Sequence, residues 1–183
     1  MQNTADLSGK TVAFVATRGV EQVELTSPWQ AVTQAGATPR LVSVQAESIT
    51  AMQGDWEHGD TFPVDVAAAE ADAGDFDALV LPGGTLNADA LRVDESVRAF
   101  VRDFVDQGKP IAAICHAPWT LIDADLVSGR TMTSYVSVRR DLENAGAVWK
   151  DEQVVVDGQL ITSRSPEDLD AFNAALVEKL AEG

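Results

Sequence analysis

The one cysteine of the chain and the residues around it form the strongest candidate for a reactive site. An apolar run from Pro110 to Ile114 leads into Cys115 and His116, and an alanine stands two residues before and two after the cysteine. A nucleophile on a tight turn between a strand and a helix needs small residues at those two places. The N-terminus of the helix that follows can lower the pKa of a thiol. We therefore expect Cys115 to be an acidic nucleophile rather than an inert core residue.

The role of His116 stays open from its position alone. It could be a general base for the thiol, donate its backbone N–H to an oxyanion, or take no part, because adjacent side chains on a helix do not face each other. The other histidine, His58, lies in a polar loop and is expected at the surface. One cysteine and two histidines are too few for a zinc site, so neither a metal nor another cofactor is expected.

Two further loops are expected to reach the same place. Gly83 and Gly84 follow the apolar run Phe76 to Leu81, and paired glycines let the backbone approach a ligand and expose its N–H groups. Glu21 and Glu24 follow the first apolar run. Burial beside a thiolate raises the pKa of a carboxyl, which could then hold a proton for the sulfur. The alternative is that both glutamates are solvated acids at a helix start.

The order of strand-like and helix-like segments predicts how these loops are positioned. Four runs have the length and composition of strands: Lys10–Ala16, Arg40–Val44, Phe76–Leu81 and Pro110–Ile114. Helices are expected from an N-cap at Ser27, with Pro28 in the first turn, to about Gly36; from Asp94 to Gly108; and after an N-cap at Ser165, with Pro166 at the first helical position. Paired short runs at 51–65 and 154–162 predict hairpins.

This alternation predicts an α/β fold in one domain over residues 1–183, with a mainly parallel sheet and helices on both faces. In such a sheet, ligands bind beyond the carboxyl ends of the strands, where all three loops are expected. A G-x-G-x-x-G motif after the first strand, as in dinucleotide-binding dehydrogenases, is absent from the sequence.

Composition excludes several classes of partner. The 183 residues carry 29 acidic and 13 basic side chains, a formal charge of −16, and 45% of them are hydrophobic, which is typical of a globular domain. Nucleic acids and anionic membranes bind basic surfaces, so neither is expected as a partner. The start lacks the pattern of a signal peptide, no apolar run approaches the ~20 residues of a spanning helix, and a lone cysteine forms no internal disulfide. We expect a cytoplasmic protein.

Several segments together resemble the ThiJ/PfpI superfamily, in its PfpI-like branch of intracellular proteases and protein deglycases. They are VEQVEL (20–25), FDALVLPGG (76–84), KPIAAICHAPW (109–119), TSYVSVRRDLENAGA (133–147) and VVVDGQLITSRSPEDL (154–169). The resemblance implies a flavodoxin-like three-layer sandwich and assemblies of two or more copies. It also implies a nucleophilic Cys115 followed by His116, Glu24 bonded to the cysteine with Glu21 as a second carboxylate, and an oxyanion loop at Gly83 and Gly84.

The sequence departs from that family at two places. Ala117 stands where a glycine usually follows the Cys-His pair. In hexameric members a neighbouring subunit supplies a glutamate after the paired glycines, and the matching position is Ala88, so proteolysis by that triad would need Asp89 as a substitute. Class I glutamine amidotransferases share the elbow but need a later histidine, and none follows His116.

Three functions remain open, and all depend on Cys115. The leading one is a stress-related enzyme that acts on small reactive carbonyls, of the glyoxalase or protein deglycase type. The second is an intracellular cysteine peptidase. The third is a non-catalytic redox sensor or chaperone-like protein in which Cys115 is oxidised to a sulfinate.

Overall fold

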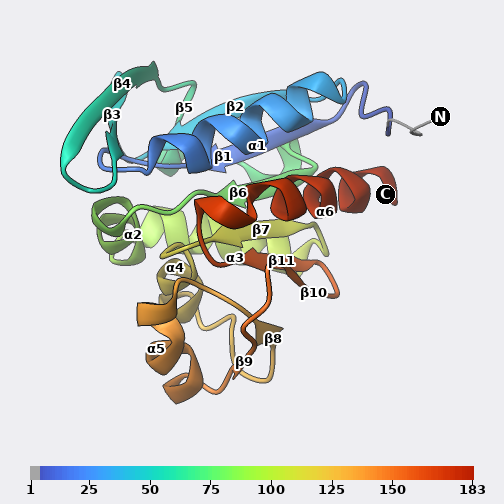
Figure 1. Ribbon diagram of the computed structural model, residues 1–183. Coiled ribbons are helices and arrows are strands. Elements are labelled where there is room, and N and C mark those ends of the chain that lie inside the picture. The colour runs from blue at the N-terminus through green and yellow to red at the C-terminus, as the bar shows by residue number, and fades with distance from the viewer. Residues whose placement is uncertain (1–4) are drawn as a thin grey trace.

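A seven-stranded sheet forms the centre of the protein in a computed structural model that describes residues 5–183 (Figure 1). The strand order is β10-β11-β7-β6-β1-β2-β5. Pairing is parallel throughout, except that β10 is antiparallel to β11. The strands are β1 (Thr11–Val15), β2 (Thr38–Ser43), β5 (Val66–Ala67), β6 (Ala78–Leu81), β7 (Ile111–Ile114), β10 (Val155–Asp157) and β11 (Leu160–Ser163). The predicted α/β class with a mainly parallel sheet is confirmed.

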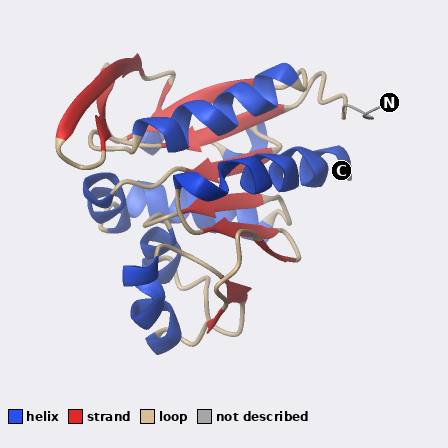
Figure 2. Ribbon diagram, viewed as in Figure 1, coloured by secondary structure: helices blue, strands red, loops and turns tan. Residues whose placement is uncertain are grey.

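Helices cover both faces of the sheet and make three layers (Figure 2). The six helices of residues 5–183 are α1 (Gln22–Gln34), α2 (Thr85–Arg92), α3 (Glu95–Asp106), α4 (Pro118–Asp123), α5 (Arg139–Asn144) and α6 (Leu169–Ala181). Val12 and Phe14 of β1 pack in the cluster with α1 and α6, whereas Ala13 and Val15 pack in the cluster with α3. This alternation follows the two-residue period of a strand and makes β1 apolar on both faces.

A separate hairpin of β3 (Ser48–Gln53) and β4 (Glu57–Pro63) extends beside the start of α1 (Figure 1). It is attached there by a hydrogen bond of 2.8 Å from Met52 N–H to the carbonyl of Val20. Both predicted hairpins are confirmed, since β10 and β11 also pair around their turn. Short elements complete the chain: β8 (Thr131–Met132), β9 (Val148–Trp149) and 3-10 turns at Ala68–Glu70, Ala73–Asp75, Val136–Val138 and Pro166–Asp168.

The predicted start of the first helix at Ser27 is wrong, because α1 begins at Gln22 and holds Pro28 in its second turn. Proline favours the first turn, because further in its missing N–H removes the helical hydrogen bond to the carbonyl four residues earlier, here that of Glu24. The earlier start places Glu24 on the helix itself, with its side chain fully buried. The end near Gly36 is confirmed, since that residue adopts a φ of +99°.

The other helix predictions hold with small shifts. The side chain of Asp94 caps α3 by accepting a 3.0 Å hydrogen bond from Val97 N–H. Pro166 opens a 3-10 turn after Ser165, and α6 begins only at Leu169. Within residues 5–183, no helix combines the length and apolar character needed to cross a lipid bilayer.

Candidate active site

Cys115 occupies a strained turn between β7 and α4. Its φ of +64° lies in the left-handed region, which costs a non-glycine residue about 1–2 kcal/mol. Three backbone hydrogen bonds hold the turn: Cys115 N–H to Ser163 O at 3.1 Å, Tyr135 N–H to Cys115 O at 2.9 Å, and Ala117 N–H to Ile114 O at 3.1 Å. This is the geometry of a nucleophile elbow, and Pro118 opens the following helix as predicted.

The open question of whether His116 reaches the cysteine is answered by this turn. Nδ1 of His116 lies 3.1 Å from Sγ of Cys115. Adjacent side chains diverge on a helix, but Cys115 is not helical, so the two can meet. Ser137 Oγ lies 3.3 Å from Nε2, and the ring of Tyr135 stacks on the imidazole with centroids 4.7 Å apart. The imidazole is therefore fixed at both nitrogens and on one face.

Burial lowers the pKa of His116, although the charge of Asp55 partly opposes this effect. The imidazole is consequently neutral at neutral pH and has one nitrogen lone pair. In the tautomer whose Nε2–H donates to Ser137 Oγ, that lone pair is on Nδ1 and faces the thiol. His116 is thus placed as a proton acceptor for Cys115.

Glu24 is fully buried beside the same sulfur. Its Oε2 accepts a 2.8 Å hydrogen bond from Gly83 N–H, and its Oε1 is buried with no hydrogen-bond partner among residues 5–183. Burial raises the pKa of Glu24 to about 8, against smaller lowering by hydrogen bonds from Cys115 and Gly83. The carboxyl is mostly protonated at neutral pH and can donate its proton to the sulfur, as the sequence predicted.

The expected acidity of the thiol is contradicted. Burial, reinforced by the charge of Glu24 when that group is ionised, raises the pKa of Cys115, while hydrogen bonds from the N–H groups of Gly84 and His116 lower it less. The sulfur lies inside the protein rather than at a solvated helix end, so desolvation outweighs the backbone dipoles. Cys115 is a thiol at rest and must transfer its proton before or during attack.

The paired glycines are required by close contacts. A Cβ on Gly83 would lie 2.7 Å from Cys115 Cβ, and one on Gly84, whose φ is +89°, would lie 2.5 Å from Glu21 N. Gly83 N–H is engaged by Glu24. The N–H groups of Gly84 and His116 face the sulfur. They are therefore placed to hold an oxyanion that forms next to it.

Sequence reasoning missed Asn87, which holds this glycine loop from the first turn of α2. Its side chain is fully buried, accepts from Thr17 N–H at 2.7 Å, and donates to the carbonyls of Pro82 and Gly83, both at 3.0 Å. The only signal in the sequence was an amide side chain at a position where a short helix faces the core. Tyr135 and Ser137 were also missed, because they reach His116 from a distant 3-10 turn.

The β3–β4 hairpin forms one wall of the site. Glu21 Oε2 accepts from Gly54 N–H at 2.9 Å, and Asp55 accepts from Thr85 Oγ1 at 2.8 Å and, weakly, from Thr85 N–H at 3.3 Å. Burial raises the pKa of Glu21. The resulting cavity measures about 390 Å³, and its lining includes three carboxyl groups but no lysine or arginine. The lining residues are Glu21, Glu24, Gly54, Asp55, Gly84, Thr85, Cys115, His116, Tyr135 and Pro166.

The structure thus brings all six predicted site residues to one place: Cys115, His116, Glu24, Glu21, Gly83 and Gly84. His58 lies apart on the exposed face of β4. Ala88 is buried and Asp89 is exposed on α2. Among residues 5–183, no group of three or more His, Cys, Asp and Glu side chains is arranged to hold a metal ion.

A flavodoxin-like sandwich with a cysteine at a nucleophile elbow defines an α/β protein with a thiol site. The chain belongs to the DJ-1/PfpI family, whose pattern matches residues 10–179. It is 44% identical over 164 residues to a Bacillus subtilis protein named "Putative cysteine protease YraA", with 90% of this chain and 94% of that protein covered. It is also 42% identical to an uncharacterized protein of Staphylococcus aureus strain Mu50, covering 93% and 98%.

Solved structures show the same fold. DJ-1beta of Drosophila melanogaster superposes with a TM-score of 0.85 at 30% identity, covering 95% of this chain and 91% of that one. A two-domain protein of Anabaena variabilis, with DJ-1/ThiJ/PfpI-like and ferritin-like domains, superposes with a TM-score of 0.88 at 37% identity. That match covers 93% of this chain and 48% of the larger one.

Proposed function

We propose that the protein is a cysteine-dependent enzyme of carbonyl stress, acting on methylglyoxal or its early adducts on proteins. The observation that carries the proposal is the 3.1 Å distance from Cys115 Sγ to His116 Nδ1, with a protonated Glu24 at the same sulfur. A thiol with both a proton acceptor and a proton donor beside it is suited to addition to a carbonyl group.

In the proposed reaction, Sγ attacks the aldehyde carbon of methylglyoxal while the thiol proton moves to His116 Nδ1. The carbonyl oxygen takes up the π electron pair, is held by the N–H groups of Gly84 and His116, and is protonated to give a hemithioacetal. Moving the C1 proton to C2 through Glu24 or His116 converts this to a lactoyl thioester. Water then releases lactate and the thiol, so methylglyoxal and water give lactate with no external oxidant or reductant.

The shape and charge of the cavity support a small substrate. A volume of about 390 Å³ accommodates a three-carbon dicarbonyl and leaves room for part of a side chain that carries an adduct. The carboxyl groups of Glu21 and Asp55 at the wall disfavour anionic substrates. Methylglyoxal is neutral, and its early carbinolamine adducts on lysine and arginine carry no negative charge.

Lactate production tests this function. Freshly reduced protein is expected to convert methylglyoxal to lactate at a steady rate, and the Cys115→Ala variant is expected to lose that rate, because no other residue in the cavity can supply the thiol. An absence of lactate from the reduced protein would remove the proposal.

Peptide hydrolysis is the second candidate, supported by the Cys115–His116 contact within one chain and by the printed name of the Bacillus subtilis relative. It would require an acyl-enzyme and a base for its hydrolysis. The group that contacts Nε2 of His116, where the third member of a catalytic triad would lie, is the hydroxyl of Ser137 rather than a carboxylate. Cys115-dependent cleavage of a panel of fluorogenic peptides, without lactate production, would reverse the order of the two candidates.

Oxidation sensing has weaker support, because thiolates are the species that peroxide attacks and burial raises the pKa of Cys115. Intact-mass measurement after mild peroxide treatment separates it from catalysis. A stoichiometric gain of about 32 Da that is lost in Cys115→Ala would favour the sensor.

A further inference from the structure

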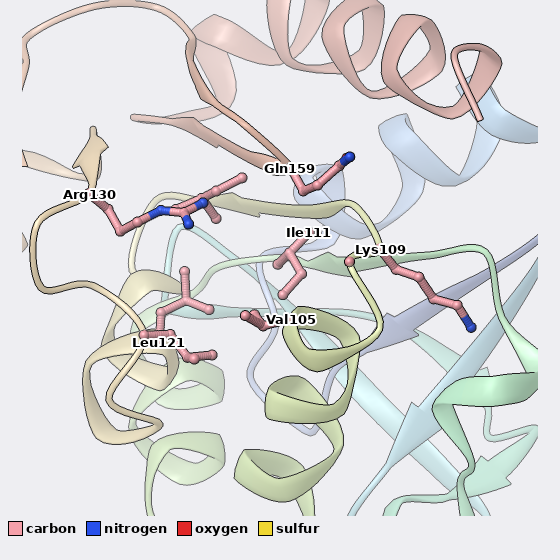
Figure 3. A pocket seen from close by; sticks show the side chains of 9 residues that line it. Val105, Lys109, Ile111, Leu121, Arg130 and Gln159 are labelled. Atoms are coloured by element: carbon pink, nitrogen blue, oxygen red, sulfur yellow. The ribbon is translucent and has the colours of Figure 1, made fainter.

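A second cavity lies at the opposite end of β7 from Cys115. It has a volume of about 140 Å³ and is open on one side, between the end of α3, α4 and the β10–β11 turn (Figure 3). Ile111, Leu121 and Leu160 form its buried floor, and Val105 and Leu126 form its walls. The surface offered to an occupant is therefore mainly aliphatic, with Gly108, Lys109, Arg130 and Gln159 completing the lining.

The polar groups of this second cavity are confined to its rim, where Arg130 is the cation that reaches over it. In Figure 3 the Arg130 side chain extends towards Ile111, whereas Lys109 extends away from it. The Lys109 ammonium instead donates to the carbonyl of Ala73 at 2.7 Å. A single guanidinium thus stands over an aliphatic pocket.

Part of that guanidinium is free to bind. Nη2 of Arg130 donates to the carbonyl of Asp157 at 2.9 Å, and Nε lies 3.3 Å from Asp157 Oδ2. Oδ2 also accepts a 2.8 Å hydrogen bond from Thr131 N–H, so the carboxylate is shared. Nη1 makes no hydrogen bond to any residue within 5–183, which leaves donors in the planar geometry that matches a carboxylate.

We propose that this cavity is a binding site for a small monocarboxylate whose hydrocarbon part is about the size of one six-membered ring. The size follows from the volume, which is close to the roughly 150 Å³ of a dry apolar cavity that holds benzene. The ring would lie on Ile111, Leu121 and Leu160, and the carboxylate would pair with Arg130. The site is separate from Cys115, so the proposal does not depend on the reaction proposed above.

Benzoate is a suitable probe, and the methyl NMR signals of leucine and isoleucine report on the floor of the cavity. Titration of the full-length protein is expected to shift the signals of Ile111, Leu121 and Leu160 in a saturable way, with a dissociation constant below about 5 mM. Toluene lacks the carboxylate and is expected to bind at least about tenfold more weakly than benzoate. If benzoate produces no saturable shift of these signals, the proposal is wrong.

Two matched pairs of variants separate the parts of the proposal. Val105→Phe fills the cavity and should abolish benzoate binding, while Val44→Phe, at a similarly exposed position after β2 and outside the cavity lining, should not. Arg130→Gln should weaken benzoate at least about tenfold and leave toluene unchanged, whereas Arg140→Gln, whose side chain is 80% exposed, should alter neither. Wild-type affinity in Val105→Phe would contradict the cavity, and wild-type affinity for benzoate in Arg130→Gln would contradict the carboxylate.

Discussion

Cys115 combines two properties that oppose each other at the scale of single residues. Its burial keeps the proton on sulfur, and its strained position points that sulfur at a neutral imidazole. Because the sulfur stays protonated until it attacks a substrate, it reacts little with oxidants between turnovers. Catalysis then depends on how well His116 receives the proton.

Replacement of His116 by glutamine removes this proton acceptor. We expect kcat to fall by about 10²–10⁴-fold, the usual range for loss of a general base. His58→Gln is the matched control, because His58 is exposed on β4. This substitution is expected to leave kcat within about twofold of wild type. Equal losses in the two variants, measured as steady-state lactate formation, would contradict the assignment of His116.

Glu24 makes the stability of the protein depend on pH. Its pKa is about 8 in the folded protein against an ordinary value of 4.5, so the folded state retains a proton that the unfolded chain loses. Stability from this group therefore falls as pH rises from about 4.5 to about 8, by at most about 1.4 kcal/mol per pH unit. Above pH 8 the contribution is constant.

Glu24→Gln removes the titration while its amide oxygen can still accept from Gly83. Urea unfolding of both proteins at several pH values between 5 and 8 gives the difference in unfolding free energy. We expect the variant to gain stability relative to wild type as pH rises through this window. A difference that stays constant with pH would show that Glu24 is ionised in the folded protein.

At the scale of elements, the start of α2 holds the catalytic loop through Asn87. Asn87→Ala would leave Thr17 N–H and the carbonyl of Pro82 without their partner, and the carbonyl of Gly83 with only the 3.3 Å hydrogen bond from Glu21 N–H. We expect a loss of roughly 2–4 kcal/mol in unfolding free energy and a lower kcat, because Gly84 N–H would no longer be fixed at the sulfur. Asp89→Ala, exposed on the same helix, should change the unfolding free energy by less than about 0.5 kcal/mol.

The elements that the sequence predicted best are those defined by local patterns. The apolar periodicity of α3 and its Asp94 cap, the hairpin turns and the elbow at Cys115 all depend on residues close together in the chain. The rule that parallel strands end at one edge was enough to bring Glu24 and the glycine loop to the cysteine. The start of α1 was mistaken because Pro28 favours a first turn, and only packing against the sheet shows that the helix begins earlier.

Properties that depend on distant contacts were not predictable in this way. Asn87 meets Thr17 across 70 positions, and Ser137 meets His116 across 21. The direction of the Cys115 pKa depends on how deeply the sulfur is buried, which no spacing in the sequence reveals.

At the scale of the whole molecule, the formal charge of −16 and the acidic wall of the site act in the same direction on a ligand. Glyoxylate and glycolaldehyde are two-carbon aldehydes that can both form hemithioacetals, but only glyoxylate is an anion. Raising NaCl from about 20 to about 500 mM should lower the inhibition constant of glyoxylate by roughly threefold or more and leave that of glycolaldehyde unchanged. The same salt response for both would show that the field of the protein does not reach the site.

The central claim is that a carbonyl substrate becomes covalently attached to Cys115 during turnover, and mass spectrometry tests it most directly. Reduced protein mixed with methylglyoxal, quenched in acid and fragmented should carry about 72 Da on Cys115 while substrate lasts and lose it once substrate is consumed. Lactate formation by Cys115→Ser at the wild-type rate, or turnover of the wild type with Cys115 unmodified throughout, would contradict the account.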